Sequence, residues 1–562
     1  MMMMMRLLGV ALVVGVMAVA ALPAPAAATA AAAAVRTIGG DDDAAAPPSN
    51  QPPHILMVLV DDLGWADVGY HRSGPHKSDI QTPTIDKLVS QGIALERHYV
   101  HKVCSPTRAS FQSGRLPVHG IDGQVVLCAP RAGIPENMTT VAQHLNKAGY
   151  ASHFVGKWDV GMATPSHTPH GRGYNTSLNY FGHANWMWNQ DEWQGSQNNV
   201  SHRPPCKAPD CFKDFWDTDR PAHNLSGTLY EEQLFVQRIT DIIEAHDPSQ
   251  PLFLTYASKV AHYPLQAPIE YQQQFANIEP PSRRVYHAMV KYLDDNLYYI
   301  TTLMQKKGMW NNTLMVFSSD NGGPVMAFDG DCDASHPSRG YMCYNGEAGA
   351  NNYPLRGGKY SFFEGGIRVN AFVSGGLIPA DQRGSNRTGI MHIADWYATF
   401  CALAGVDPTD HRAAAANLPP IDSHNMWPYL AGQARFSPRD TVLVDRDVLV
   451  FGDYKLLLGA SNPMANWSGP AYPNATTATS PISRYTLNCS DPGCLFNVVE
   501  DPEERHDLAE EKPDILKLMK FTLTELAKSI FPYNPGPVDP QCMKTAETKY
   551  DGFYGPWLNL DG

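Results

Sequence analysis

The chain of 562 residues is long enough to bury a large core and exceeds the size of one ordinary domain. Its 43% hydrophobic and 18% charged residues are typical of a globular protein, which excludes a largely disordered chain. The formal net charge of −13 argues against a nucleic acid or an anionic membrane as a partner.

The N-terminus has the pattern of a secretory signal peptide, which we predict for residues 1–28. Arg6 precedes an apolar run from Leu7 to Leu22, and small residues that suit cleavage follow at Ala26–Ala28. The alternative is an uncleaved signal anchor, which the shortness of the run disfavours. Residues 29–52 are rich in Ala, Asp and Pro and are predicted to form a flexible leader. No other stretch is apolar enough to cross a bilayer, so we expect no stable membrane insertion of the mature protein.

Strands and helices then alternate, which predicts a large α/β domain with a mostly parallel sheet over residues 53–432. Ile55–Val60 is a continuous apolar run with β-branched residues, as expected for a strand buried on both faces. Residues 180–221 lack any hydrophobic period and are predicted to be a long loop region lining the substrate cleft. We expect further strands at 151–155, 252–257, 314–319 and 367–373, and helices at 84–91, 139–148, 230–246, 283–307 and 393–404.

The pattern changes after residue 432. Short apolar segments at 441–444, 448–451 and 454–458 have hairpin spacing, and an amphipathic helix is expected at 512–529. Residues 433–562 are therefore predicted to form a small α+β subdomain with an antiparallel sheet and one covering helix.

Ten cysteines behind a signal peptide indicate disulfide bonds. Three pairs close in sequence could each close a loop, namely Cys206/Cys211, Cys332/Cys343 and Cys489/Cys494. A dense set of Asn-x-Ser/Thr acceptor sites fits a glycosylated extracellular or lysosomal protein. These sites are Asn137, Asn175, Asn199, Asn224, Asn311, Asn386, Asn466, Asn474 and Asn488.

Two strand ends carry oxygen ligands. Asp61 and Asp62 follow the strand at 55–60, and Asp320 and Asn321 follow the strand at 314–319. Neighbouring parallel strands would bring these ends together at the edge where open α/β sheets bind ligands. Oxygen ligands of this type suit Ca²⁺ or Mg²⁺ better than Zn²⁺, which favours His and Cys. A solvated loop is the alternative at each strand end.

Cys104 stands where a helix is expected to begin. Pro106 suits the first helical turn, and Arg108 lies one turn from Cys104. An anion is favoured at such a positive helix end, so the cysteine could be an activated thiolate or part of an anion pocket. A buried or disulfide-bonded cysteine is the alternative.

The run Cys104-Ser105-Pro106-Thr107-Arg108, followed by Ser113-Gly114-Arg115, resembles the signature of the type I sulfatases. The resemblance covers nearly the whole chain from about Pro53 and implies an alkaline-phosphatase-like large domain. It is strongest to arylsulfatases of the arylsulfatase B (N-acetylgalactosamine-4-sulfatase) type. The segments that carry this closer match are Asp61-Asp62-Leu63-Gly64-Trp65, Pro354-Leu355-Arg356-Gly357 and Glu364-Gly365-Gly366.

The resemblance implies a mechanism and its residues. A formylglycine-generating enzyme would convert Cys104 to 3-oxoalanine (formylglycine), whose hydrated aldehyde attacks the sulfur of a sulfate ester. One Ca²⁺ would be held by Asp61, Asp62, Asp320, Asn321 and the oxidised residue 104. The resemblance also implies the roles of the basic residues: Arg108, Lys157 and Lys359 hold formylglycine and sulfate, and His262 lies near the leaving oxygen.

The resemblance further implies a disulfide between Cys128 and Cys542, which leaves Cys401 as a buried free thiol. It implies a secreted or lysosomal enzyme that cleaves sulfate esters, with sulfated sugars as one substrate class. The oligomeric state and the choice between secretion and the lysosome stay open.

One residue departs from the family pattern, because Asp159 replaces the histidine of Gly-Lys-Trp-His-x-Gly. Its charge near bound sulfate is unfavourable unless a cation offsets it. Asp159 could be an alternative base, change the choice of substrate, or reduce activity. Two other functions therefore stay open: a phosphoester or phosphonate hydrolase of the same superfamily, and a sulfated-glycan-binding relative with weakened catalysis.

Overall fold

The structure is a computed structural model that describes residues 51–72, 79–191, 212–279, 281–325, 348–469 and 486–559. The predicted signal peptide and most of the predicted leader lie outside these residues. So do the cysteine pairs Cys206/Cys211 and Cys332/Cys343.

A ten-stranded sheet forms the centre of the fold, with the order β11-β2-β10-β9-β1-β8-β4-β5-β6-β7. Its five middle strands, from β9 to β5, are parallel, which confirms the predicted α/β class. Every residue of β1, β8 and β9 is buried, as expected for apolar strands covered on both faces. These strands are β1 (His54–Val60), β4 (Ala151–Lys157), β5 (Thr176–Tyr180), β8 (Leu252–Ser258) and β9 (Thr313–Ser319).

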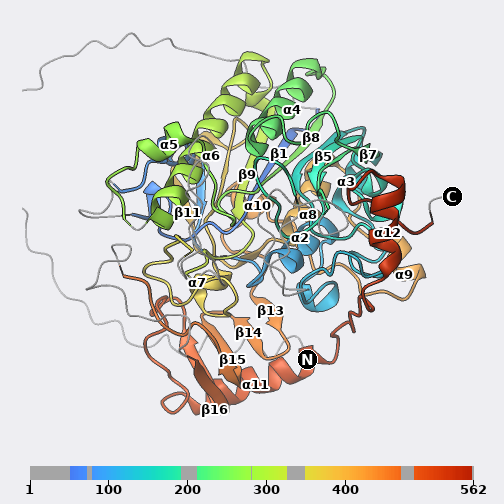
Figure 1. Ribbon diagram of the computed structural model, residues 1–562. Coiled ribbons are helices and arrows are strands. Elements are labelled where there is room, and N and C mark those ends of the chain that lie inside the picture. The colour runs from blue at the N-terminus through green and yellow to red at the C-terminus, as the bar shows by residue number, and fades with distance from the viewer. Residues whose placement is uncertain are drawn as a thin grey trace, which may run out of the picture. The chain divides into compact units, whose positions relative to one another are not determined.

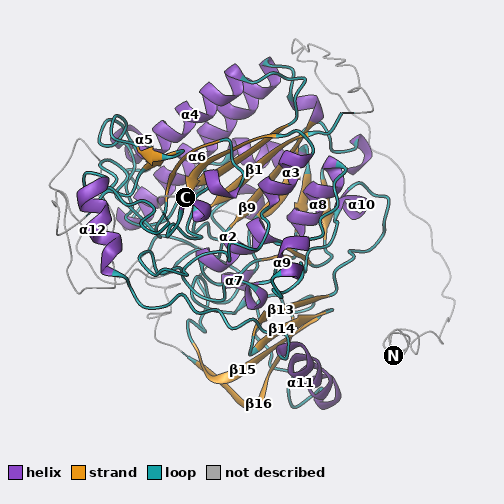
Figure 2. Cartoon of the chain, turned by 90° about the vertical axis from the view of Figure 1, so that its right-hand side faces the viewer, coloured by secondary structure: helices purple, strands orange, loops and turns teal. Residues whose placement is uncertain are grey.

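Helices cover both faces of this sheet (Figure 2). Ile55, Met57 and Leu59 of β1 face one apolar core, and Leu56, Val58 and Val60 face the other. The first core is packed with α2 (Cys104–Ser113), α3 (Val141–Lys147) and α8 (Asp395–Ala404). The second is packed with α1 (Pro83–Ser90), α4 (Glu231–Ala245) and α6 (Pro281–Lys306). Shorter elements are α5 (Ile269–Gln273), α9 (His411–Ala415), α10 (Trp427–Leu430), and the paired strands β3 (His98–Tyr99) and β12 (Met391–His392).

The outer strands differ from the prediction in two ways. The strand expected at 367–373 is wrong in its first half, because Glu364–Ile367 forms the short helix α7 and the strand β10 is Ala371–Ser374. Close packing explains the turn, since a Cβ on Gly366 would lie 2.1 Å from the carbonyl oxygen of Ser361. The remaining edge strands were not predicted, and β6 and β7 lie within the region 180–221 that was expected to be a loop. These strands are β2 (Ile93–Leu95), β6 (Trp216–Asp217), β7 (Arg220–Pro221) and β11 (Ser385–Arg387).

A separate four-stranded antiparallel sheet with α11 (Pro513–Ala527) beside it follows in the chain, as predicted (Figure 1). Its strands are β13 (Thr441–Asp445), β14 (Val448–Phe451), β15 (Tyr454–Asn462) and β16 (Leu487–Asn497). The chain then returns to the large sheet's side of the molecule, where α12 (Pro540–Lys549) lies away from β13–β16 in both views. Cys542, Tyr554 and Trp557 belong to the first core of the large sheet. The division of the chain at residue 432 stays a prediction.

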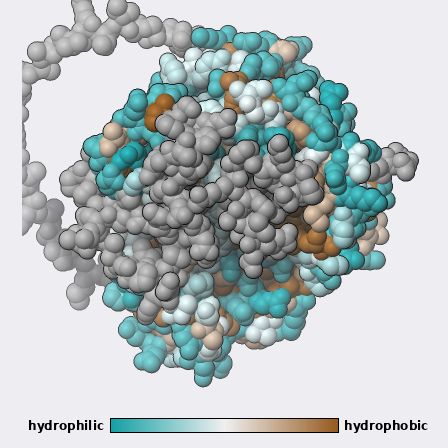
Figure 3. Space-filling view, viewed as in Figure 1, coloured by the Kyte–Doolittle hydropathy of each residue, from teal (hydrophilic) through white to brown (hydrophobic). Residues whose placement is uncertain are grey.

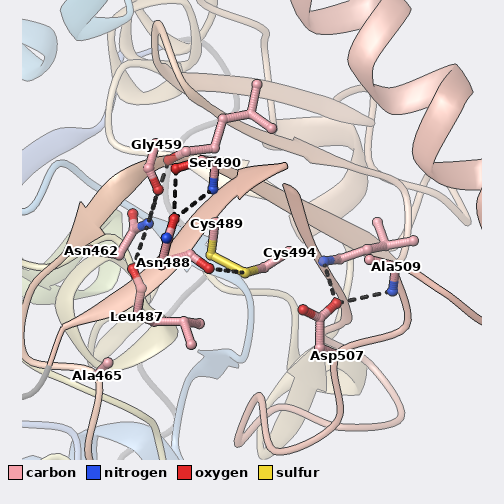
Figure 4. Close-up of a disulfide and its surroundings, with 12 residues drawn as sticks. Gly459, Asn462, Ala465, Leu487, Asn488, Cys489, Ser490, Cys494, Asp507 and Ala509 are labelled. Atoms are coloured by element: carbon pink, nitrogen blue, oxygen red, sulfur yellow. Dashed lines mark hydrogen bonds between the residues drawn. A yellow bond between two sulfur atoms is a disulfide. The ribbon is translucent and has the colours of Figure 1, made fainter. Parts of the chain in front are cut away.

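Two predicted disulfides are present, and both hold C-terminal segments. Cys128–Cys542 ties α12 to the large domain across a sequence separation of 414 residues. Cys489–Cys494 closes a short turn within β16 (Figure 4). Cys401 is a buried free thiol, as expected.

We expect loss of the Cys128–Cys542 bond to destabilise the protein more than loss of Cys489–Cys494. In the chain-entropy model, closing loops of these lengths is worth about 6 and about 2 kcal/mol, respectively. The double Ser variants of each pair can be compared by denaturant unfolding, with limited proteolysis of the C-terminal tail as a second measurement. Equal losses of unfolding free energy would contradict a structural role of the long-range bond.

Where the face in Figure 3 is not covered by grey atoms, hydrophilic and hydrophobic residues are mixed on the surface. Within the described part of the chain, the most exposed large hydrophobic side chains are Phe436, Phe521 and Tyr298. None of the helices in that part combines the length and the apolar composition needed to cross a membrane.

Candidate active site

The strand-end carboxylates meet as the sequence predicts. β1 and β9 are parallel neighbours with Val60 paired to Ser319, so the residues that follow them lie side by side. The Asp62 backbone N–H donates to Asp320 Oδ1 (3.2 Å), and Asn321 Nδ2 donates to Asp62 Oδ1 (2.6 Å). Asp61, Asp62, Asp320 and Asn321 are all fully buried, so the solvated-loop alternative is wrong for both strand ends.

Cys104 is the first residue of α2, and this helix begins beside the two strand ends. The ligand atoms of Cys104, Asp61 and Asp320 all lie within 4.8 Å of one another. Cys104 is buried and free, so the disulfide alternative finds no partner among the described cysteines. The helix start therefore presents a sulfur atom directly to the carboxylate cluster.

Three buried cations surround this cluster. Lys157, the last residue of β4, donates from Nζ to Asp61 Oδ2 (2.8 Å). Arg108 donates from Nε to Asp320 Oδ2 (2.9 Å) and from one terminal nitrogen to the Lys157 carbonyl oxygen (2.8 Å). Lys359 Nζ lies 2.7 Å from Asp62 Oδ1. All three predicted cations thus contact the predicted oxygen ligands or their strands.

Burial and mutual repulsion perturb the carboxylates. Burial, with the neighbouring Asp61 charge, raises the pKa of Asp320 to about 7. Burial also raises the pKa of Asp62. For Asp61, burial acts upward, but Lys157, His262 and Arg108 hold its pKa well below the usual range. The three carboxylates therefore repel one another, and Lys157, Arg108 and Lys359 offset this repulsion.

The donor set fits a hard divalent cation. Within the described residues, Asp61 Oδ1, Asp62 Oδ2 and Asn321 Oδ1 are buried and receive no hydrogen bond. Buried oxygen atoms without donors are costly in an apolar interior, and a cation would satisfy them. Carboxylate and amide oxygens are the ligands that Ca²⁺ and Mg²⁺ prefer.

His262 lies on the Asp62 side of the cluster. Its Nδ1 donates to the Tyr263 carbonyl oxygen (2.5 Å), and its Nε2 lies 3.7 Å from Asp62 Oδ2. Burial and the charge of Lys359 hold the pKa of His262 well below its ordinary value. His262 and Lys359 thus flank the same carboxylate from two separate segments.

Asp159 also lies in the cluster, and it has a partner that the sequence reasoning missed. Asp159 Oδ2 lies 3.9 Å from Lys157 Nζ, and Asp159 Oδ1 lies 2.9 Å from His183 Nδ1. One ligand atom each of Cys104, Asp159 and His183 lie within 4.8 Å of one another. His183 follows β5 by three residues, inside the region read as a long loop. The short run before it, Thr176–Tyr180, pairs with β4, and its local sequence pattern gives no signal of this pairing.

Comparison with known proteins identifies relatives along most of the chain. The family model described as Sulfatase matches residues 53–406. Arylsulfatase J of Mus musculus is 31% identical over 531 residues, which cover 90% of this chain and 80% of that protein. N-acetylgalactosamine-6-sulfatase of Homo sapiens is 29% identical over 407 residues, covering 71% of this chain and 69% of that protein.

Solved structures agree with these relatives. The crystal structure of Ps i-CgsB superposes with a TM-score of 0.66 at 25% identity, covering 86% of this chain and 94% of that one. The PsFucS1 sulfatase from Pseudoalteromonas sp. shares the fold with a TM-score of 0.62 at 23% identity, covering 86% and 92%. Because the family model spans more than half of the residues and includes both strand ends and Cys104, the chain belongs to the sulfatase family.

Proposed function

We propose that this sulfatase hydrolyses sulfate esters at the buried cluster around Cys104, with residue 104 converted to formylglycine and one Ca²⁺ held beside it. The observation that carries the proposal is the meeting of Cys104 with Asp61 and Asp320, ringed by buried cations. Family membership supports sulfuric ester hydrolysis as the reaction.

The residues of the site fit both the Ca²⁺ ion and a formylglycine at position 104. Asp61, Asp62, Asp320 and Asn321 would hold the ion. Asp61, Asp62 and Asn321 each have a buried oxygen without a donor, and Asp320 lies beside Asp61 and Cys104. In this chemistry formylglycine supplies the nucleophilic oxygen, and the ion supplies positive charge that polarises the sulfate.

The remaining residues bind and orient the substrate. Arg108 joins Asp320 to the end of β4, so it fixes the start of α2 against both strands. Lys157 and Lys359 place ammonium groups on two sides of the cluster, where they can bind the anionic oxygens of a sulfate ester. In the net reaction a sulfur–oxygen bond forms with an oxygen that water supplies, the bond from sulfur to the ester oxygen breaks, and the departing alcohol takes a proton. Lys359, beside Asp62, is positioned to donate to that oxygen, and the His262 ring lies on the same side of the cluster.

Two further features support a sulfated sugar as the substrate class and the secretory pathway as the location. A similar protein is named for N-acetylgalactosamine 6-sulfate chemistry, and Ps i-CgsB has been solved with k-i-k-neocarrahexaose. Of the acceptor sites within the described residues, Asn466 is half-buried and the others are exposed, as glycosylation requires. The exposed sites are Asn137, Asn175, Asn224, Asn311, Asn386 and Asn488.

Turnover of matched aryl esters tests this function. The protein is expressed together with a formylglycine-generating enzyme. We then expect kcat/KM for the aryl sulfate to exceed kcat/KM for the aryl phosphate by about 100-fold or more, because the cations and the nucleophile are held in positions that suit a sulfate group. The mass of the peptide containing Cys104 shows in the same sample whether the thiol has become an aldehyde. Preference for phosphate would indicate a phosphoester hydrolase. Glycan binding without sulfate release, in protein that carries the aldehyde, would indicate a binding relative.

A further inference from the structure

The position of Asp159 poses an electrostatic problem. Its carboxylate is fully buried next to Cys104, where the proposed function brings an anionic sulfate ester. Two negative charges a few ångströms apart in a poorly hydrated site repel strongly. Lys157 does not offset Asp159 fully, because its Nζ lies 2.8 Å from Asp61 and 3.9 Å from Asp159.

His183 is placed to solve this problem. Its Nδ1 lies 2.9 Å from Asp159 Oδ1, and ligand atoms of His183, Asp159 and Cys104 all lie within 4.8 Å of one another. A carboxylate paired with an imidazolium carries no net charge, which is the charge of one neutral histidine.

The backbone brings the two residues together from neighbouring strands. Lys157 pairs with Tyr180 at the carboxyl ends of β4 and β5. Asp159 follows two residues later with φ 54°, a left-handed conformation that Asp tolerates better than most residues. His183 follows three residues after Tyr180, so both side chains reach the same edge of the sheet.

Exposure distinguishes His183 from the other residues of the cluster. Its side chain is 32% exposed. Each of the ten site residues predicted from the sequence is at most 2% exposed. His183 therefore reaches from the buried nucleophile position to the solvent from which a substrate must arrive.

We propose that His183 is a catalytic residue that contacts residue 104 and the sulfate ester, and that Asp159 is a positioning residue that orients the ring and balances its charge. This inference rests on the proposed function of the same site. The family pattern has a histidine at position 159, after β4. In this chain we assign the imidazole to His183, after β5.

Binding of inorganic sulfate to Ca²⁺-loaded, unconverted protein tests the pair without requiring turnover. His183→Gln leaves the Asp159 charge unbalanced, so we expect sulfate affinity to fall about 10-fold or more. Adding Asp159→Asn to His183→Gln removes that charge, and most of the affinity returns. A ring that only supports the loop would give additive losses in this double-mutant cycle, which would overturn the inference.

Turnover of aryl sulfate by the converted proteins gives the second readout. We expect kcat to fall about 10²- to 10³-fold in His183→Gln and to stay low in the double variant, which binds sulfate but lacks the imidazole. Wild-type kcat in the double variant would overturn the catalytic role. Because the wild-type protein is measured in the same assay, an absence of any aryl sulfate turnover would count against the proposed function and not against the pair.

The chain offers a matched control in a second Asp–His pair. His119 Nδ1 lies 2.9 Å from both carboxylate oxygens of Asp422, beyond the far end of α2 from Cys104. His119→Gln is expected to leave sulfate affinity and kcat unchanged. Thermal unfolding and Ca²⁺ titration of every variant separate loss of the pair from loss of the fold. Equal effects of His119→Gln and His183→Gln would contradict the inference.

Discussion

Replacing Cys104 by alanine is expected to lower kcat/KM for aryl sulfate by at least about 10³-fold, the scale seen when a covalent nucleophile is removed. The physical reason is the placement of the sulfur atom. It lies within 4.8 Å of ligand atoms of Asp61 and Asp320, at the start of α2, and buried cations surround this position. Without residue 104, the cluster can still bind an anion but has no oxygen with which to attack it. Steady-state hydrolysis of an aryl sulfate measures the effect.

Cys401→Ala is the matched control, because Cys401 is also buried and free but lies in α8 among apolar residues. Burial raises the pKa of the Cys401 thiol to about 12, which makes it unreactive. We expect this variant to lose some stability and to keep its kcat/KM. Retained hydrolysis in Cys104→Ala, or a comparable loss in Cys401→Ala, would contradict the assignment of the nucleophile.

Replacing Asp320 by asparagine is expected to weaken Ca²⁺ binding by about 100-fold or more, because it removes one of three buried carboxylates from the oxygen cluster. The amide keeps the shape of the side chain but leaves Arg108, which lies 2.7 Å from Asp320 Oδ2, without its closest counter-charge. At a fixed, saturating Ca²⁺ concentration, a 100-fold weaker Kd lowers the ligand-induced stabilisation by about 2.7 kcal/mol. Ca²⁺ titration by calorimetry and thermal unfolding with and without chelator measure both effects.

Asp395→Asn serves as the control for loss of a buried ion pair. Asp395 is fully buried and lies 2.6 Å from Arg439, outside the Cys104 cluster. Its replacement is expected to lower stability equally with and without chelator and to leave the Kd for Ca²⁺ unchanged. If Asp320→Asn behaved in the same way, the strand ends would not be the metal site.

The Asp159–His183 pair changes how the departure from the family pattern should be understood. A lone buried aspartate beside a sulfate site would argue for weakened catalysis. Paired with a half-buried histidine, it forms a neutral unit that presents an imidazole to the same place. We therefore expect the protein to be an active sulfatase in which His183, and not residue 159, provides the imidazole.

The sequence alone determined the parts of this protein that depend on local pattern. Continuous apolar runs predicted β1 and β9, because a strand buried on both faces must be apolar along its whole length. The polar residues that end those strands could then be assigned to one edge of a parallel sheet. The cysteine signature predicted the start of α2, and the close spacing of Cys489 and Cys494 predicted their bond, whereas the Cys128–Cys542 bond was implied by the family resemblance.

Only the tertiary structure decided what depends on strand pairing and close packing. β5 is five residues long and carries no distinct hydrophobic period, so neither the strand nor His183 beyond it could be placed from local pattern. The register of Lys157 with Tyr180 brings His183 to Asp159, and register is a property of two paired strands. Likewise, the turn at Glu364–Ile367 and the return of α12 to the large domain follow from contacts with segments distant in sequence. The nucleophile and the oxygen ligands could thus be predicted from the sequence. The pairing of Asp159 with His183, which balances the charge beside them, depends on the tertiary structure.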